Sequence, residues 1–349
     1  MSAFSPSAAV FSKGNFPAFH PAWFCPGPHL QSVWGYFFHR PPACPWRREH
    51  WETPDGDVLA LDFLEPPGRE GGSLPTLLAL HGLEGSSDSF YIRGLAAGAA
   101  ARGWRTAALN FRSCGGAPNR LPRLYHSGET GDLEYVVCRL SEGLEGPLLL
   151  AGFSLGGNVL LKWLGERGEG VPGHVLAAAA VSASFAPGAC AAALDSPRGA
   201  LYRRSFIHYL REKFREIGRR HPGVIDPEKV RRMRTFAELD RWFTAPLHGF
   251  ADERDYYERA SSLGDLPRIR VPTLLLSAAD DPIVPSDVFP REAVAASPWL
   301  RGALLPTGGH IGFVEGRNPR AAGFWAEKRL LEFLAACLEG EGSLPPLEG

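Results

Sequence analysis

The sequence predicts an α/β fold in which a mostly parallel, doubly wound sheet is covered by helices. Two observations carry this prediction. Short apolar runs alternate with longer segments of helical pattern from about Trp51 onward, and the runs are continuous, as expected of strands buried on both faces. The expected strands span residues 74–82, 104–111, 147–153, 175–182 and 271–278. The expected helices span residues 90–102, 130–141, 155–166, 286–296 and 321–338.

The alternation stops after Ser182 and resumes only at Val271, which divides the chain into regions. We interpret residues 185–266 as a helical cap inserted into a core made of residues 51–184 and 267–340. Apolar residues in the cap recur at spacings of three and four among basic ones, which predicts an amphipathic helix with a solvated outer face; contact with lipid head groups is the alternative. These apolar residues are Ile207, Leu210, Phe214 and Ile217. Residues 1–50 are rich in proline and aromatics without periodicity, which predicts an extended arm lying on the core.

Composition excludes several classes of function. Lys and Arg total 37 against 38 Asp and Glu, so the net charge of -1 provides no broad field to attract nucleic acid or an anionic membrane. The six cysteines form no CxxC pair, which favours reduced thiols over a disulfide framework. No signal-peptide pattern is found, and the longest apolar stretch, residues 175–194, is interrupted by polar residues and Pro187. We therefore expect a cytoplasmic protein with neither nucleic-acid binding nor integral membrane association.

The pentapeptide GFSLG, residues 152–156, has the GxSxG pattern of a nucleophile elbow. The pattern alone is weak in a chain with 40 glycines. Its position is more informative, because it joins the end of a predicted strand to the start of a predicted helix. The sharp turn forces the serine into strained geometry, so bulky neighbours at Gly152 and Gly156 would collide. Ser154 is therefore predicted to be a nucleophile exposed at a helix N-terminus.

A serine hydroxyl needs a base, and the base needs a carboxylate to orient it. The segment SAADDPIVP follows the last long strand pattern, and TGGHIGF follows the short apolar run 302–306. The order Ser154, aspartate, His310 is the order typical of the α/β-hydrolase fold, which we therefore predict. We assign the orienting acid to Asp281, directly before the Pro-x-Val-Pro turn, and keep the neighbouring Asp280 as the alternative.

The loop LHGLEGSS, residues 80–87, follows another strand pattern at the place where this fold provides an oxyanion-hole donor. We assign the backbone N–H groups of Leu83 and Leu155 to the oxyanion hole. His81 is interpreted as structural, since His310 already fills the role of the base.

Taken together, these motifs resemble the YheT-like (abhydrolase-domain type 4) family of α/β-hydrolase-fold serine esterases, over nearly the whole chain. The similar segments also include PHLQSVWG, NFRSCGG, YHSGETGDL and residues 235–261. The resemblance implies a triad of Ser154, Asp281 and His310 and hydrolysis of carboxylic esters, with acyl transfer to an alcohol known among relatives. Ser113 is a departure, because the family often has glycine there. The HLQS and YHSG segments suggest no chemistry of their own, and we assign them to loop packing or pocket shaping.

The predicted function is hydrolysis of a small-molecule or lipid ester, of short to medium acyl length, through an acyl-enzyme without metal or organic cofactor. Aromatic residues of the cap favour an acyl-binding pocket, although the same residues could pack the lid. They are Phe206, Phe214, Phe236, Trp242 and Phe243. Three alternatives share the scaffold: an acyltransferase with an alcohol acceptor, a perhydrolase, and a catalytically idle binding module. The physiological ester and the oligomeric state are not indicated by the sequence.

Overall fold

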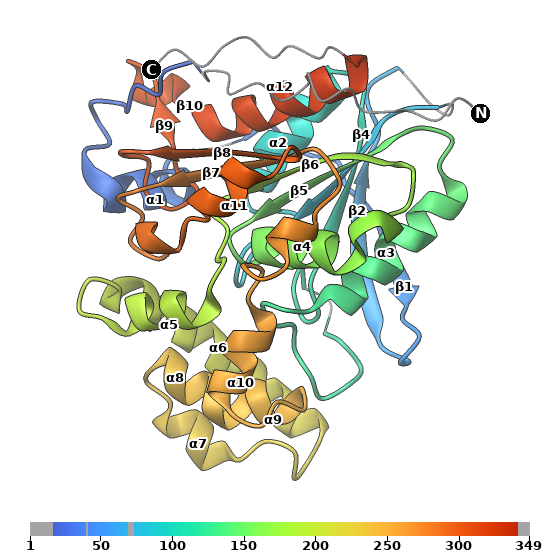
Figure 1. Cartoon of the computed structure of the whole chain (residues 1–349). Helices are drawn as coiled ribbons and strands as arrows, with labels where there is room; N and C mark the ends of the chain where they lie inside the picture. Colours follow the sequence, from blue (N-terminus) through green and yellow to red (C-terminus); the bar gives the residue numbers. More distant parts are fainter. Residues whose placement is uncertain (1–16, 40, 69–72, 117, 341–349) are drawn as a thin grey trace.

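The structure, a computed structural model, describes residues 17–39, 41–68, 73–116 and 118–340. Its centre is an eight-stranded sheet with the order β1-β2-β4-β3-β5-β6-β7-β8, shown in Figure 1. The strands β3 to β8 are parallel to one another, whereas β2 is antiparallel to both of its neighbours. The α/β-hydrolase fold class predicted from the sequence is therefore confirmed. The strand bounds are β1 Arg47–Glu52, β2 Val58–Leu64, β3 Thr76–Leu80, β4 Arg105–Asn110, β5 Leu148–Phe153, β6 Val175–Val181, β7 Thr273–Ala278 and β8 Leu300–Leu305.

The central strands are buried on both faces, as their unbroken apolar sequences require. The helices α2 (Phe90–Ala101) and α12 (Trp325–Glu339) cover one face and pack on each other. The opposite face is covered by α3 (Thr130–Gly143), α4 (Leu155–Arg167) and α11 (Arg291–Ala296). Because all of β3, β5 and β7 run in one direction, their carboxyl ends meet at one edge of the sheet, where a ligand site is expected.

The chain between β6 and β7 consists of helices joined by loops and lies beyond the carboxyl edge of the sheet, at the bottom of Figure 1. It contains the predicted cap, residues 185–266, and its apolar side chains join the core cluster that lies under α3 and α4. The division into an arm, a core and a cap stays a prediction of domain organisation. The elements are α5 Pro187–Asp195, α6 Ala200–Arg220, α7 Pro227–Arg232, α8 Phe236–Leu239, η3 Asp240–Thr244, α9 Ala245–Leu247, α10 Glu253–Ala260 and η4 Leu266–Arg268.

The N-terminal region differs from the extended arm that was predicted for residues 1–50. Residues 1–16 lie outside the described part of the chain, but Gly27–Phe37 forms the helix α1 and β1 begins already at Arg47. The prediction overlooked Leu30, Val33, Trp34 and Phe37, which recur at helical spacing. This apolar face is not the buried one: the buried residues of α1 are Gln31, Ser32 and Gly35, whereas Leu30 and Phe37 are exposed.

Two predicted helices near the C-terminus have different bounds. The segment 286–296 is divided into the short turn η5 (Ser286–Val288) and α11, with Pro290 between them. Proline lacks the backbone N–H that a continuing helix needs. The final helix starts at Trp325, because Gly323–Phe324 forms β10 and pairs with β9 (Val314–Glu315). None of the helices in the described residues has the length and apolarity needed to cross a membrane.

Candidate active site

Ser154 lies at the sharp turn between β5 and α4. Its φ of 51° is in the left-handed region that side chains seldom adopt, so the turn stores strain at this residue. The flanking glycines make the turn possible. A Cβ atom at Gly152 would stand 2.5 Å from the carbonyl oxygen of Gly156, and one at Gly156 would stand 2.4 Å from that of His81. The predicted elbow geometry is therefore present, with Ser154 at the N-terminus of α4.

His310 joins Ser154 to Asp281 through its two ring nitrogens. Its Nε2 lies 2.9 Å from Ser154 Oγ, and its Nδ1 lies 2.8 Å from Asp281 Oδ2. The other oxygen of Asp281 accepts hydrogen bonds from the N–H groups of Ile283 and Val284, at 2.8 and 3.0 Å. The carboxylate is thus fixed in orientation by the Pro-x-Val-Pro turn that follows it. A proton can pass from the serine hydroxyl to a ring held in one position.

Asp280, the alternative acid, faces a different group. Its Oδ1 accepts a hydrogen bond of 2.9 Å from the backbone N–H of Gly309, so it holds the loop that carries His310 rather than the imidazole itself. Burial raises the pKa of this carboxyl above its usual value. The two adjacent aspartates therefore contact the same loop at two points. Asp281 contacts the side chain of His310, whereas Asp280 contacts the backbone N–H of Gly309.

The loop that carries His310 is supported from outside by α1. The N–H of His310 donates to Ser32 Oγ at 2.8 Å, and the N–H of Val314 donates to Gln31 Oε1 at 2.6 Å. Glycine is required where the two segments touch, because a Cβ at Gly312 would stand 2.0 Å from the carbonyl oxygen of Gln31. The HLQS segment thus supplies the second support of the histidine loop. These contacts agree with the assignment of this segment to loop packing, although sequence reasoning did not identify the histidine loop as its partner.

The loop after β3 passes directly beside Ser154. A Cβ at Gly82 would lie 3.1 Å from Ser154 Cβ, and the N–H of Gly82 donates to the hydroxyl of Tyr91 at 3.0 Å. Leu83 and Leu155 both line the same cavity as Ser154, and the backbone N–H of neither donates to another described residue. Two backbone donors without a hydrogen-bond partner in the described chain therefore belong to residues of this cavity, and their assignment to an oxyanion hole stays a prediction.

His81 has a structural role in this loop. The N–H of Phe111 donates to its Nε2 at 3.1 Å, so the ring proton is on Nδ1 and is donated to the carbonyl oxygen of Gly82 at 2.7 Å. Burial lowers the pKa of His81 to about 3, which keeps the ring neutral. The interpretation of His81 as a loop-shaping residue agrees with these contacts.

Ser113 follows β4 with a φ of 60°, which is also left-handed. Glycine adopts this conformation at little cost, which gives a physical reason for the glycine that the resemblance implies at this position. The hydroxyl of Ser113 donates to Asn119, so this chain tolerates the strain with a local hydrogen bond.

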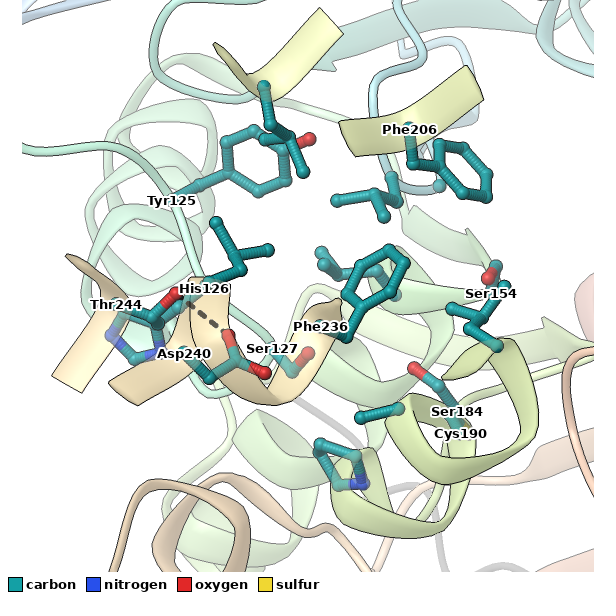
Figure 2. A pocket seen from close by; sticks show the side chains of 18 of the residues that line it. Tyr125, His126, Ser127, Ser154, Ser184, Cys190, Phe206, Phe236, Asp240 and Thr244 are labelled. Atoms are coloured by element: carbon teal, nitrogen blue, oxygen red, sulfur yellow. Dashed lines mark hydrogen bonds between the residues drawn. The ribbon is translucent and has the colours of Figure 1, made fainter. Parts of the chain in front are cut away.

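A cavity of about 120 Å³ lies between the carboxyl edge of the sheet and the cap. Its walls are mainly apolar and come from α5, α6 and α8 of the cap. Figure 2 shows Ser154 on one side of the cavity with Phe206 and Phe236 beside the open space. Of the five cap aromatics singled out in the sequence, three line the cavity, whereas Trp242 and Phe243 do not. Phe243 instead stacks behind Phe214 at a ring distance of 4.4 Å.

The side of the cavity opposite Ser154 carries a buried acidic residue of the cap. Asp240 lies there on η3, a turn of π-helix, and accepts a hydrogen bond from Thr244 Oγ1 at 2.8 Å (Figure 2). It also accepts one from the hydroxyl of Tyr257 at 2.9 Å. No cation acts on Asp240 in the described residues, and burial raises the pKa of this carboxyl to about 7. A buried carboxyl therefore shares the cavity with the serine but belongs to the cap.

One group of side chains has the composition of a metal site. The donor atoms of His126, Glu129 and His248 lie within 4.8 Å of one another. The N–H of Gly128, however, donates to Nδ1 of His126 at 3.1 Å, so the ring proton is on Nε2 and faces Glu129 Oε2 at 3.4 Å. A metal ion on Nε2 would have to displace that proton. These contacts favour a hydrogen-bonded wall of the cavity, which agrees with a packing role for the YHSG segment.

Comparison with known proteins supports the same fold. Residues 75–317 match the α/β hydrolase fold family. YheT of Escherichia coli (strain K12) is 35% identical over 318 residues, which cover 90% of this chain and 92% of that protein. Phospholipase ABHD3 of mouse is 31% identical over 92% of this chain and 79% of its own length.

A solved structure extends this likeness to the fold. An esterase of Pyrococcus furiosus, Pf2001, has a TM-score of 0.55 and 16% identity, with 94% of this chain and 99% of that chain covered. Its likeness shows the fold, whereas the sequence relatives show the family. The chain therefore belongs to the α/β-hydrolase fold family and, within it, to the YheT-like group.

Proposed function

We propose that this protein is a serine hydrolase that cleaves carboxylic esters through an acyl-enzyme. The observation that carries the proposal is the line of two hydrogen bonds from Asp281 through His310 to Ser154, at 2.8 and 2.9 Å. The same three side chains in the same order form the catalytic triad of this fold. Related proteins with hydrolytic names include phospholipase ABHD3 of mouse and the monoacylglycerol lipase of Saccharomyces cerevisiae.

The reaction would proceed in two halves. His310 removes the hydroxyl proton of Ser154 as Oγ attacks the ester carbonyl, and Asp281 stabilises the resulting imidazolium. The N–H groups of Leu83 and Leu155 stabilise the oxyanion of the tetrahedral intermediate. His310 then gives the proton to the departing alcohol. In the second half His310 takes a proton from the attacking water and returns it to Ser154 Oγ as the carboxylic acid leaves.

We propose a short- to medium-chain acyl ester as the substrate. This proposal is supported by the small, mostly apolar cavity under the cap, which suits a hydrocarbon chain better than a charged group. The decisive measurement is kcat/KM for a series of p-nitrophenyl esters of increasing acyl length, with and without added lipid vesicles. A single sharp optimum is expected. Equal rates at all lengths would contradict a pocket that encloses the chain.

Replacement of Ser154 tests the chemistry. The Ser154→Ala variant is expected to lose at least about a ten-thousandfold in kcat and all labelling by a fluorophosphonate, with an unchanged circular dichroism spectrum. Product analysis with added ethanol distinguishes hydrolysis from acyl transfer, since a transferase yields the ethyl ester. Covalent labelling of Ser154→Ala at the wild-type rate would overturn the assignment of the nucleophile.

A further inference from the structure

A buried ion pair connects the cap to the loop beside Ser154. Lys213, on the helix α6, places its Nζ 2.8 Å from Oε1 of Glu84, the residue that directly follows Leu83. The side chains are 20% and 7% exposed, so the charges interact with little screening by water. The contact spans 129 residues of sequence and joins the cap to the carboxyl end of β3.

Glu84 is held in an unusual backbone conformation by the same group of residues. Its φ is 56°, in the left-handed region, and its N–H donates to the hydroxyl of Tyr125 at 2.7 Å. The Tyr125 hydroxyl in turn donates to Glu84 Oε1 at 2.9 Å. The Glu84 oxygen that accepts a hydrogen bond from Lys213 Nζ therefore also accepts one from the Tyr125 hydroxyl. Both contacts fix the peptide that follows Leu83. A strained conformation of this kind persists only where its surroundings hold it.

The second contact of Lys213 is with the core. Its Nζ lies 3.1 Å from Cys114 Sγ and 5.5 Å from the centre of the Tyr125 ring. Burial raises the pKa of Cys114 to about 11, so the sulfur is a neutral thiol. The ammonium group therefore has one full charge partner, Glu84, and its position depends on α6 remaining seated on the core.

The same stretch of α6 lines the substrate cavity. Leu210 and Phe214, on either side of Lys213 along the helix, are wall residues of the cavity that contains Ser154. A displacement of α6 would thus open the cavity and withdraw the ammonium from Glu84 together.

We propose that Lys213 is a positioning residue, which acts through Glu84 to hold the Leu83 N–H in the orientation that stabilises the oxyanion. The inference rests on the proposed function of Ser154 and assigns a part of the site to the cap. Without the ammonium, the Glu84 carboxylate lacks its charge partner and the left-handed turn loses a constraint. The Leu83 N–H is then less well aimed at the transition state, while the acyl chain still meets the same apolar walls. The turnover number should fall more than the apparent affinity for substrate.

The experiment compares Lys213→Met with Lys213→Arg and with a matched control. Lys162 provides the control, because its Nζ pairs with Asp265 and with Glu166, each at 3.0 Å, and its side chain is 12% exposed, but it lines no part of the cavity around Ser154 in the described chain. For Lys213→Met we expect kcat to fall about 10- to 100-fold, with KM within about threefold of the wild-type value. Lys213→Arg should recover most of the loss. Lys162→Met should keep the wild-type kcat below its unfolding temperature.

The Ki of an inhibitor that forms an oxyanion on Ser154 measures oxyanion stabilisation directly. A merely structural role of Lys213 would leave this Ki unchanged. An alkyl trifluoromethyl ketone adds to Ser154 as a hemiketal, so its Ki should rise for Lys213→Met by the factor by which kcat/KM falls. A wild-type kcat for Lys213→Met, or an unchanged Ki beside a reduced kcat, would overturn the proposal. If Lys213→Met does not fold, Glu84→Gln replaces it, with an expected loss of about fivefold or more in kcat and a matching rise in Ki. Should wild-type activity prove independent of Ser154, the function proposed above fails instead, so the two failures are distinguishable.

Discussion

The two sides of the active-site cavity are built by different parts of the chain and in different ways. The side with Ser154, His310 and Asp281 is formed by turns at strand ends, which are fixed by backbone hydrogen bonds and by glycines that admit no side chain. The opposite side is formed by cap helices, whose apolar residues make the wall and whose polar residue Asp240 is buried without a cationic partner in the described chain. We therefore expect the reaction chemistry to depend on the sheet edge and the choice of substrate to depend on the cap.

The largest expected effect is a difference in kcat between variants of the two adjacent aspartates at the sheet edge. In Asp281→Asn the amide can still accept from Ile283 and Val284, but it offers an N–H to His310 Nδ1 and so favours the wrong tautomer. We expect kcat to fall about ten-thousandfold. Asp280→Asn retains an acceptor for the Gly309 N–H and should lose less than about tenfold, as in substitutions that leave a triad intact. Steady-state kinetics on one activated ester measures both, and equal losses would contradict the division of roles.

An intermediate effect is expected from the support that α1 provides. Gln31→Leu removes the acceptor for the Val314 N–H and leaves that buried group unsatisfied, which costs about 1–3 kcal/mol of unfolding free energy. Because the same loop carries His310, kcat should fall about tenfold through misplacement of the base. Urea denaturation and kinetics measure the two effects. Leu30→Ala on the exposed face of α1 is the control, and an equal loss in both variants would show that the helix matters only for overall stability.

The smallest effect concerns the cap side and is a pH dependence of stability. Burial raises the pKa of Asp240 to about 7 in the folded protein, above the value of about 3.9 expected when unfolded. The folded state then holds the proton more tightly. This stabilisation is complete below about pH 4 and is lost as the pH rises to about 7, by at most a few kcal/mol. Asp240→Asn should remove that part of the slope in urea denaturation between pH 5 and 8.

The control for Asp240 is a second aspartate of the cap. Asp226→Asn keeps an acceptor for the N–H groups that begin α7, so the pH slope of unfolding should match that of the wild type. If Asp240→Asn retains the full slope, the buried carboxyl is not the group that titrates.

Local patterns were sufficient for the parallel sheet and for the order of the site residues. The strands β3 to β7 could be predicted because each is an apolar run long enough to be buried on both faces. The antiparallel β1 and β2 were not predicted as strands. The β1 sequence RREHWE is mostly polar and exposed at the sheet edge, so it carries no signal of a buried strand.

The sequence by itself determined the fold class, the elbow at Ser154 and the loops that carry Asp281 and His310, because strand periodicity and turn chemistry are local properties. Tertiary structure alone decided which aspartate faces His310, that Gln31 and Ser32 hold the histidine loop, and that Lys213 reaches Glu84. Each of these contacts joins residues that are far apart in the chain or that differ only in the direction of a side chain. Such contacts depend on how the whole chain packs, and neither composition nor spacing records that packing.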